Sequence, residues 1–477
     1  MSIKVLIFAL IFLLLGLFSF AQNSIVKRPQ RCHTQPPSQV WNNWFNQKVN
    51  DYKQNLAKEK SKSTSSYLIP VVFHIIYGNE AEGTYPNLDQ AQIVSQINIL
   101  NNDYAGIGFN TGLYSQMGAN GHLPFYEYSQ TNSLPAPDDN GVTISNTGIS
   151  FILASEDPSG NLLPEPGIDR ESYITKKWSN PASIPDEGTL MSYLDQTIKP
   201  NTIWDPTKYF NVWLTDENNS VQMLGYSTFP SGTNLAGLDG GGSSNANATT
   251  DGCWIWSMSC GDTISVAAPY NKGRTLTHES GHYLGLRHVW GDGNCLTDYC
   301  NDIPPAATAN YVSQGTGYPY HVNTCSSAGA YNNNVDGEMF MNFMDYSDDG
   351  AMWMFTNDQL LRMHTALTQS TDRIGLTASA NSMRTKSVAK ISLDKSIDIY
   401  PNPTVDGHFN ISVNVAEATN LQIVIENILG KLVFKNNENS VAHNTLRYQF
   451  PTFEKGIYFI TIINSNGDKI VRKIVVQ

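Results

Sequence analysis

Three histidines and one glutamate fall within eleven residues, in the segment HESGHYLGLRH at 278–288. His278 and His282 are four residues apart, so on a helix both imidazoles lie on one face and can bind one metal ion. Gly285 allows the chain to leave the helix with a positive φ, which lets His288 return as a third ligand. Three neutral histidines leave a fourth position open, which is typical of a catalytic rather than a structural zinc.

Glu279 comes directly after the first of these histidines. A helix turns by about 100° per residue, so Glu279 lies too far round the axis to be a third ligand. It stays close enough to take a proton from a water activated by the metal. The pattern therefore predicts a zinc-dependent hydrolase. The alternative that the residues allow is an amphipathic helix whose histidines are hydrogen-bonded in a core.

Several strands and one helix that could position this segment precede it in the chain. β-Branched and aromatic residues predict strands over 67–78, 148–157 and 209–217. LGYSTFP, at 224–230, predicts an edge strand that ends at Pro230, because proline cannot donate to a neighbouring strand. The apolar spacing of NLDQAQIVSQINILNNDYAG, with Asp89 near its start, predicts a helix. The Gly/Ser/Asn tract at 238–252 predicts a loop.

The N-terminus has the pattern of an export signal. A lone Lys4, an apolar run over 5–18 and a small residue at Ala21 predict a secretory signal peptide over 1–21. No later stretch is apolar for long enough to predict a transmembrane segment. The mature chain is therefore expected outside the cytoplasm, where disulfides are permitted.

Residues 22–62 predict a polar leader. Its sizeable apolar residues, which predict that it docks on the rest of the chain, are Trp41, Trp44 and Phe45. Its eight Lys/Arg and two Asp/Glu give +6, whereas the whole chain carries −12 and residues 63–380 carry −22. The contrast predicts either attraction between leader and body or a leader that is simply solvated. The acidic body argues against nucleic-acid binding.

The six cysteines are unevenly distributed. Five surround the histidine motif, namely Cys253, Cys260, Cys295, Cys300 and Cys325. Cys32 stands alone in the leader. Because five is an odd number, disulfides confined to the cluster leave one thiol over, and Cys32 either pairs with it or has another role.

The composition changes after residue 376. Small residues without an apolar period predict a linker over 377–394. From residue 395 to 477, short alternating strands and the Asn-Gly turn of NSNGDK predict a small all-β sandwich. This tail has no cysteines and no clustered titratable groups, so it is not expected to be catalytic.

The histidine motif also carries a family resemblance. HESGHYLGLRH matches the HExxHxxGxxH signature of the metzincin metallopeptidases, and NFMDY at 342–346 resembles their Met-turn. The form HxLGLxHxW, together with DYCNDIP and NFMDYSDD, resembles the pappalysin family, the group that contains ulilysin. With IPVVFHIIY, IWDPTKYFNVWL and LGYSTFP, the resemblance covers about 67–376. It implies an α/β (α+β) metzincin-like catalytic domain over 63–376, with a mostly antiparallel or mixed sheet and an active-site helix.

The resemblance implies roles for individual residues. Three would bind zinc, namely His278, His282 and His288. Glu279 would be general base and then general acid, while Tyr346 would hydrogen-bond the tetrahedral intermediate above the apolar floor made by Met344. The family's acidic pocket just after the Met-turn falls on Asp348 or Asp349, which implies cleavage before Arg or Lys.

The resemblance extends to calcium and to disulfides. Family calcium sites near the third histidine imply three hard oxygen donors, Asp292, Asp298 and Asp302, although an ordinary acidic loop fits the same residues. Cys295, Cys300 and Cys325 fall where the family keeps disulfides, but one expected partner is missing. The easiest local bridge to propose joins Cys253 and Cys260.

Latent relatives of this kind use a leader cysteine whose thiolate takes the open zinc position. PQRCHTQ places Arg31 before Cys32, as that motif does, although His33 stands where glycine is common. The resemblance therefore implies that 22–62 is a propeptide and that Cys32 maintains latency.

The tail, with IDIYPNPTVDG and KGIYFITI, resembles the sorting domains of the type IX secretion machinery; a carbohydrate-binding or adhesive sandwich is the alternative. The prediction for the whole chain is a secreted or surface-attached zinc endopeptidase, made as a zymogen, that acts on protein or peptide substrates. The alternatives are a cell-surface adhesin with a structural or vestigial metal site, and a hydrolase with a non-protein substrate.

Overall fold

The computed structural model describes residues 30–58, 66–111, 142, 144–218, 220–221, 223–231, 248–262, 268–314, 322–325, 337–387, 397–404, 408–449, 454–464 and 469–477. The predicted signal peptide, most of the Gly/Ser/Asn tract and the predicted Asn-Gly turn lie outside these residues. No helix in the described part of the chain is long and apolar enough to cross a membrane.

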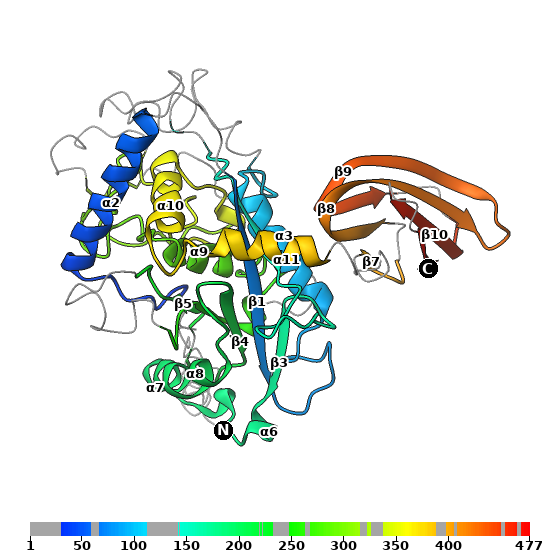
Figure 1. The fold of residues 1–477 in the computed structure, drawn as a ribbon, viewed down its shortest axis with the longest axis horizontal. Coiled ribbons are helices and arrows are strands. Elements are labelled where there is room, and N and C mark those ends of the chain that lie inside the picture. The colour runs from blue at the N-terminus through cyan, green and yellow to red at the C-terminus, as the bar shows by residue number, and fades with distance from the viewer. Residues whose placement is uncertain are drawn as a thin grey trace, which may run out of the picture.

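A mixed sheet with the order β2-β1-β4-β6-β5 organises the domain predicted over 63–376, and β3 also pairs with β1 (Figure 1). Its strands are β1 (Tyr67–Tyr77), β2 (Ile149–Leu153), β3 (Ile168–Ser172), β4 (Phe210–Thr215), β5 (Gly225–Ser227) and β6 (Cys253–Trp256). Every pair is parallel except β5 with β6. Of the predicted mostly antiparallel or mixed sheet, the mixed form is confirmed, but parallel pairs are in the majority, so the sheet is not mostly antiparallel. The prediction of an edge strand at 224–230 is also confirmed.

Both faces of the sheet are covered, which explains the nearly continuous apolar runs of its strands. On one face, Ile69, Val71, Phe73 and Ile75 of β1 belong to the main core. That core also contains apolar residues of helices α3 (Gln90–Tyr104) and α9 (Arg274–Tyr283). On the other face, Ile76 of β1 belongs to a second cluster, formed with the segment of α7 (Glu187–Tyr193) and a π-helical turn (Leu194–Ile198).

Short elements connect and close this core. They are α6 (Tyr173–Lys176), η2 (Pro181–Ser183), α8 (Lys199–Thr202), η4 (Ser257–Ser259), η6 (Asp349–Ala351) and α10 (Asn357–Gln369). α3 begins at the predicted residue, since the Asp89 side chain accepts a hydrogen bond from Gln92 N. α10 begins with a capping box between Thr356 and Gln359.

The linker predicted over 377–394 begins instead with a helix, α11 (Leu376–Ser387). Leu376, Ala380 and Met383 are buried on it. Their spacing of four and three residues is a short helical period, which the small-residue composition of the segment conceals in the sequence. The prediction of a linker is therefore corrected for 377–387, because this helix packs against β1.

One disulfide joins Cys295 and Cys325. The proposed bridge between Cys253 and Cys260 is wrong, because both are free buried thiols. Strand β6 carries the chain away from Cys253 in an extended conformation, and Cys253 Sγ donates to Ser227 Oγ at 3.2 Å. Cys32 is also a free thiol, so it forms no disulfide with a cysteine of the cluster.

The tail forms an antiparallel all-β region, as predicted. Its strands are β7 (Ile397–Tyr400), β8 (His408–Asn427), β9 (Leu432–Gln449), β10 (Gly456–Asn464) and β11 (Lys469–Val476). β9 pairs with β8 along most of its length, whereas β7 pairs with the first part of β8 and β10 with the last part. The tail has its own apolar core.

Candidate metal centre

Helix α9 carries the first two histidines of the motif. It ends at Tyr283, and Gly285 follows with a φ of +90°. Gly285 N donates to His282 O at 2.8 Å and Leu286 N donates to Gly281 O at 2.9 Å. This is a Schellman-type helix end, which requires the left-handed glycine. The turn reverses the chain, so that His288 comes back to the same site.

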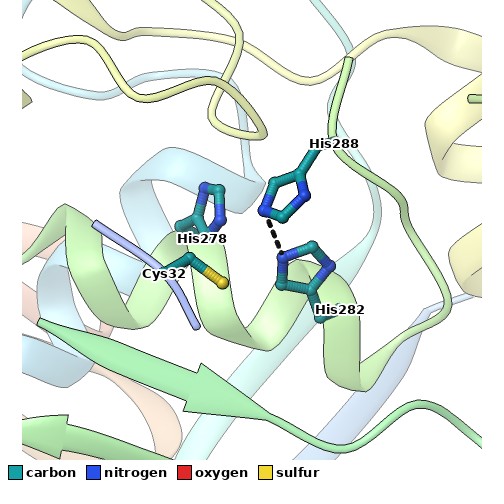
Figure 2. Close-up of side chains that lie close together, drawn as sticks. All are labelled: Cys32, His278, His282 and His288. Carbon is teal, nitrogen blue, oxygen red and sulfur yellow. Dashed lines mark hydrogen bonds between the residues drawn. The ribbon is translucent and has the colours of Figure 1, made fainter. Parts of the chain in front are cut away.

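The structure brings the three histidines together with Cys32. One ligand-type atom from each of His278, His282, His288 and Cys32 lies within 4.8 Å of all the others, and all four residues are buried. Figure 2 shows the three rings converging, with the Cys32 side chain pointing toward them from the leader. The Nε2 atoms of His282 and His288 are 3.1 Å apart.

The hydrogen bonds of the other ring nitrogens fix the tautomers. Nδ1 of His278 donates to Phe343 O at 2.7 Å, and Nδ1 of His282 donates to Leu286 O at 2.8 Å. Nδ1 of His288 pairs with the Asp292 carboxylate. With the protons on Nδ1, the Nε2 lone pairs face one another, and His278 Nε2 has no hydrogen-bond partner among the described residues. Converging lone pairs in a buried site fit a bound cation such as zinc.

Burial holds two of these rings in the neutral form that a metal requires. It lowers the pKa of His278 and of His282 well below the ordinary value, and the neighbouring histidines lower it further. Burial alone would raise the pKa of Asp292, but His288 and Arg287 hold that pKa well below its usual range. Asp292 is thus an anion that orients His288, which is how carboxylates commonly support metal-binding histidines.

Glu279 lies beside the cluster and is fully buried. Burial raises the pKa of its carboxyl to about 8. Its Oε2 accepts a hydrogen bond from Thr34 Oγ1 at 2.9 Å. Strand β5 approaches it closely at Gly225, where an added Cβ would lie 2.9 Å from Glu279 Cγ.

Met344 and Tyr346 complete the surroundings of the histidine cluster. Met344 is fully buried. A Cβ added at Gly281 of α9 would lie only 2.4 Å from Met344 Sδ. The helix can therefore rest on the methionine only because residue 281 is glycine. The Tyr346 ring centroid lies 5.2 Å from that of His288, and Tyr346 OH donates to Cys32 O at 2.9 Å.

The leader crosses the site as an extended segment along β5. Gln30 forms a parallel bridge with Met223, and His33 N donates to Gly225 O at 2.9 Å. Thr34 Oγ1 accepts from Ser227 N at 2.8 Å. Cys32 is 1% exposed, and burial with the nearby Glu279 raises the pKa of its thiol well above the ordinary value.

The two acidic candidates after the Met-turn differ in their contacts. Asp349 is fully buried, and its Oδ1 accepts from Arg31 Nη2 of the leader at 2.7 Å. Its Oδ2 accepts from Lys272 N at 2.8 Å. Arg31 also donates to Ser347 O at 2.7 Å, and its guanidinium lies 5.0 Å from the Tyr270 ring centroid. The structure thus joins Asp349 to a basic side chain of the leader.

The three calcium candidates do not come together in one cluster of ligand-type side chains within the described ranges. Asp292 is engaged by His288 and Arg287. Asp302 accepts from Thr356 Oγ1 and Asp358 N, and Asp298 accepts from Cys300 N. These separate partnerships give no support to a shared calcium site.

Two contacts of the leader were missed by sequence reasoning, those of Arg31 with Asp349 and of Thr34 with Glu279. The motif PQRCHTQ contains both residues, and the resemblance drew attention to Arg31 only as a neighbour of the cysteine. No pattern in the sequence relates Thr34 to a residue 245 positions away.

Comparisons with known proteins place the histidine motif inside a region that matches a known family. Residues 192–368 match the Peptidase_M43 family, described as pregnancy-associated plasma protein-A. The chain carries a pappalysin-family peptidase domain. Residues 398–477 match a secretion system C-terminal sorting domain, so the sorting prediction for the tail is confirmed.

Extracellular metalloproteases are among the relatives of this pappalysin domain. One from Arthroderma otae is 35% identical over 124 residues, which cover 25% of this chain and 40% of that protein. Another, from Coccidioides posadasii, is 35% identical over 142 residues, covering 29% and 43%. The chain thus spans less than half the length of these relatives. Together with the sorting domain, they assign the protein to the exterior, either secreted or attached to the outer surface.

Two solved structures from Tannerella forsythia are also similar. Mature mirolysin in complex with a cleaved peptide is 30% identical, covers 67% of this chain and 98% of its own, and has a TM-score of 0.49. A promirolysin mutant is 30% identical, covers 70% and 92%, and has the same TM-score of 0.49.

Proposed function

We propose that the chain is the latent precursor of a secreted zinc endopeptidase that hydrolyses peptide bonds before Arg or Lys. The observation that carries this proposal is the cluster of three Nε2 atoms and the Cys32 thiol beside the buried Glu279. Bound zinc would polarise the scissile carbonyl and lower the pKa of water.

The residues of this chain would then perform the proton transfers. Glu279 takes a proton from the attacking water and returns it to the leaving amine. Tyr346, whose hydroxyl now donates to a carbonyl of the leader, is aimed to donate to the oxyanion of the substrate. The three histidines hold the metal, and Met344 supports α9 beneath it.

Latency follows from what the leader contacts. Cys32 supplies the fourth ligand atom, Thr34 holds Glu279, and the Cys32 carbonyl occupies Tyr346. A thiolate is a good zinc ligand, so in the loaded protein Cys32 would block the open position. The leader also runs parallel to the edge strand.

The buried ion pair between Arg31 and Asp349 supports the preference for basic residues. A fully buried carboxylate that binds one guanidinium is suited to bind the Arg or Lys of a substrate once the leader has gone. Calcium remains a prediction of the resemblance. For the tail, we propose that its partner is the type IX secretion machinery.

The test uses the full chain after processing. Peptides that differ only in the residue after the scissile bond, as Arg, Lys, Gln or Glu, should be cut with Arg and Lys preferred. Glu279→Gln should lower the rate by ~10²–10⁴-fold, because it removes the general base. Equal rates for wild type and Glu279→Gln would contradict the proposal.

The metal is measured separately by elemental mass spectrometry. About one zinc per wild-type chain is expected, and His282→Ala should lower that occupancy. Bound zinc without any hydrolysis would favour the adhesin with a structural metal site.

A further inference from the structure

A second part of the leader, helix α2 (Gln39–Lys58), packs against α10 (Figure 1). Trp41 and Phe45 are both 0% exposed. They form an apolar cluster with Phe229 and Ala366 of the peptidase domain. The Trp41 ring lies edge-on to Phe229 at 5.1 Å, and Phe229 in turn lies 5.3 Å from the His282 ring. The helix therefore covers an apolar surface that adjoins the metal site.

Polar contacts continue along the whole helix. Trp41 Nε1 donates to Pro230 O at 2.6 Å, and Arg362 Nη1 donates to Asn46 Oδ1 at 2.7 Å. Near the end of the helix, Tyr52 OH lies 3.2 Å from His364 Nδ1. Lys53 Nζ lies 2.9 Å from Asp358 Oδ1. These contacts fix the position and direction of α2.

The peptidase side is shaped for this helix. We call the surface made by Phe229, Gly285, Asp358, Arg362 and Ala366 the leader-binding face. An added Cβ at Gly285 would lie 2.5 Å from the Phe45 ring, so the glycine that ends α9 also makes room for the leader. Arg362 lies with its guanidinium 4.9 Å from the same ring. The face thus combines an apolar pocket, a cation over an aromatic ring and an acid for Lys53.

None of these contacts involves the connection between the leader and the peptidase domain. α2 ends at Lys58, and β1 begins at Tyr67. A covalent connection of this length contributes only an effective concentration, of the order of mM. Hydrolysis of one bond in it, with water, forfeits that contribution and leaves every contact described above in place.

We propose that the leader is a separable inhibitory ligand of the leader-binding face. Cleavage between residues 58 and 67 does not activate the peptidase by itself. The cut leader stays bound, through α2 and through Arg31 to Thr34, until it dissociates or is degraded, and a free leader binds a second processed copy of this chain. The inhibitory part rests on the proposed function, whereas the binding part does not.

Binding is tested in the full chain with Glu279→Gln, which prevents self-cleavage, and with a recognition site for a site-specific protease in place of residues 59–65. After the cut, the leader fragment should co-elute with the body in size-exclusion chromatography at micromolar concentration. Separate elution would overturn the proposal. Trp41→Ala with Phe45→Ala should weaken retention by about 30-fold or more, as for buried aromatic anchors of interfaces.

The matched control is Val40→Ala with Leu56→Ala, which removes apolar side chains that are 50% and 39% exposed on the same helix. It should leave retention unchanged. A synthetic peptide of residues 30–58, with or without the two aromatic substitutions, gives the same comparison as a competitor and cannot impair folding of the body. Equal competition by both peptides would overturn the role of the aromatic pair.

Activity then separates this inference from the proposed function. The cut chain with intact Glu279 should be inactive at first and gain activity on dilution, with a lag set by leader release. Full activity immediately after the cut would overturn the inference and leave the proposed function intact. No activity even after the leader is removed would contradict the proposed function, while co-elution would still support leader binding.

Discussion

The leader and the tail flank the same peptidase domain, on opposite sides in Figure 1, but they are stabilised in different ways. The buried apolar residues of the leader belong to clusters that include peptidase residues. The core cluster of the tail contains tail residues alone. A cavity of about 660 Å³ lies where the tail meets α3, lined among others by Ile99, Phe109 and Tyr400. The leader is therefore stabilised by contacts with the peptidase domain, as a bound ligand is, whereas the tail is stabilised by a core of its own.

The largest effect is expected from Arg31→Ala. It leaves buried Asp349 without its ionic partner, which costs about 3 kcal/mol or more when a buried pair is broken. Leader binding should weaken by about 100-fold. The measurement is the rate at which an added protease removes the leader from the Glu279→Gln chain.

Lys58→Ala is the control for Arg31→Ala, because it removes a positive charge from an exposed residue of the same leader. The control should behave as wild type. If both variants release the leader equally fast, general electrostatic attraction holds the leader and the ion pair does not.

The converse prediction concerns the tail. Ile460 is fully buried in the tail core, so Ile460→Ala should destabilise the tail by ~2–5 kcal/mol. Hydrogen exchange in β8 and β10 should accelerate, while leader protection stays unchanged. Phe459→Ala is the matched control, since Phe459 is 37% exposed on the same strand. Faster leader release in Ile460→Ala would contradict the independence of the two regions.

Sequence reasoning reached the parts of the site that local spacing determines. The turn of helix between His278 and His282 and the glycine exit before His288 follow from residues within one short segment. Likewise, alternation and turn residues predicted the strands. Contacts over long sequence separations, such as Arg31 with Asp349 or Thr34 with Glu279, depend on how the leader lies on the fold. The helix at 376–387 was not predicted from the sequence, because its apolar period is only two turns long.

A smaller effect is expected from Thr34→Val. The substitution keeps the shape but removes the hydroxyl that donates to Glu279 and accepts from Ser227 N. A net loss of ~1–2 kcal/mol corresponds to leader release faster by about tenfold. Thr34→Ser keeps the hydroxyl and should stay close to wild type. If Ser and Val release the leader at the same rate, the methyl group matters and the hydrogen bonds do not.

The smallest effect is expected from Lys53→Ala, at the far end of the leader. Lys53 and Asp358 form an ion pair in which the lysine side chain is 36% exposed, so solvent screens the attraction. Such pairs contribute ~0.2–1 kcal/mol, which amounts to a change in leader release of about fivefold at most. The effect should shrink further in 0.5 M salt, whereas the effect of Arg31→Ala should persist because its partner is shielded from ions. Equal salt dependence of the two variants would mean that both ion pairs open to solvent before the leader dissociates. Arg31 would then not be a buried anchor that differs from the solvated contact of Lys53.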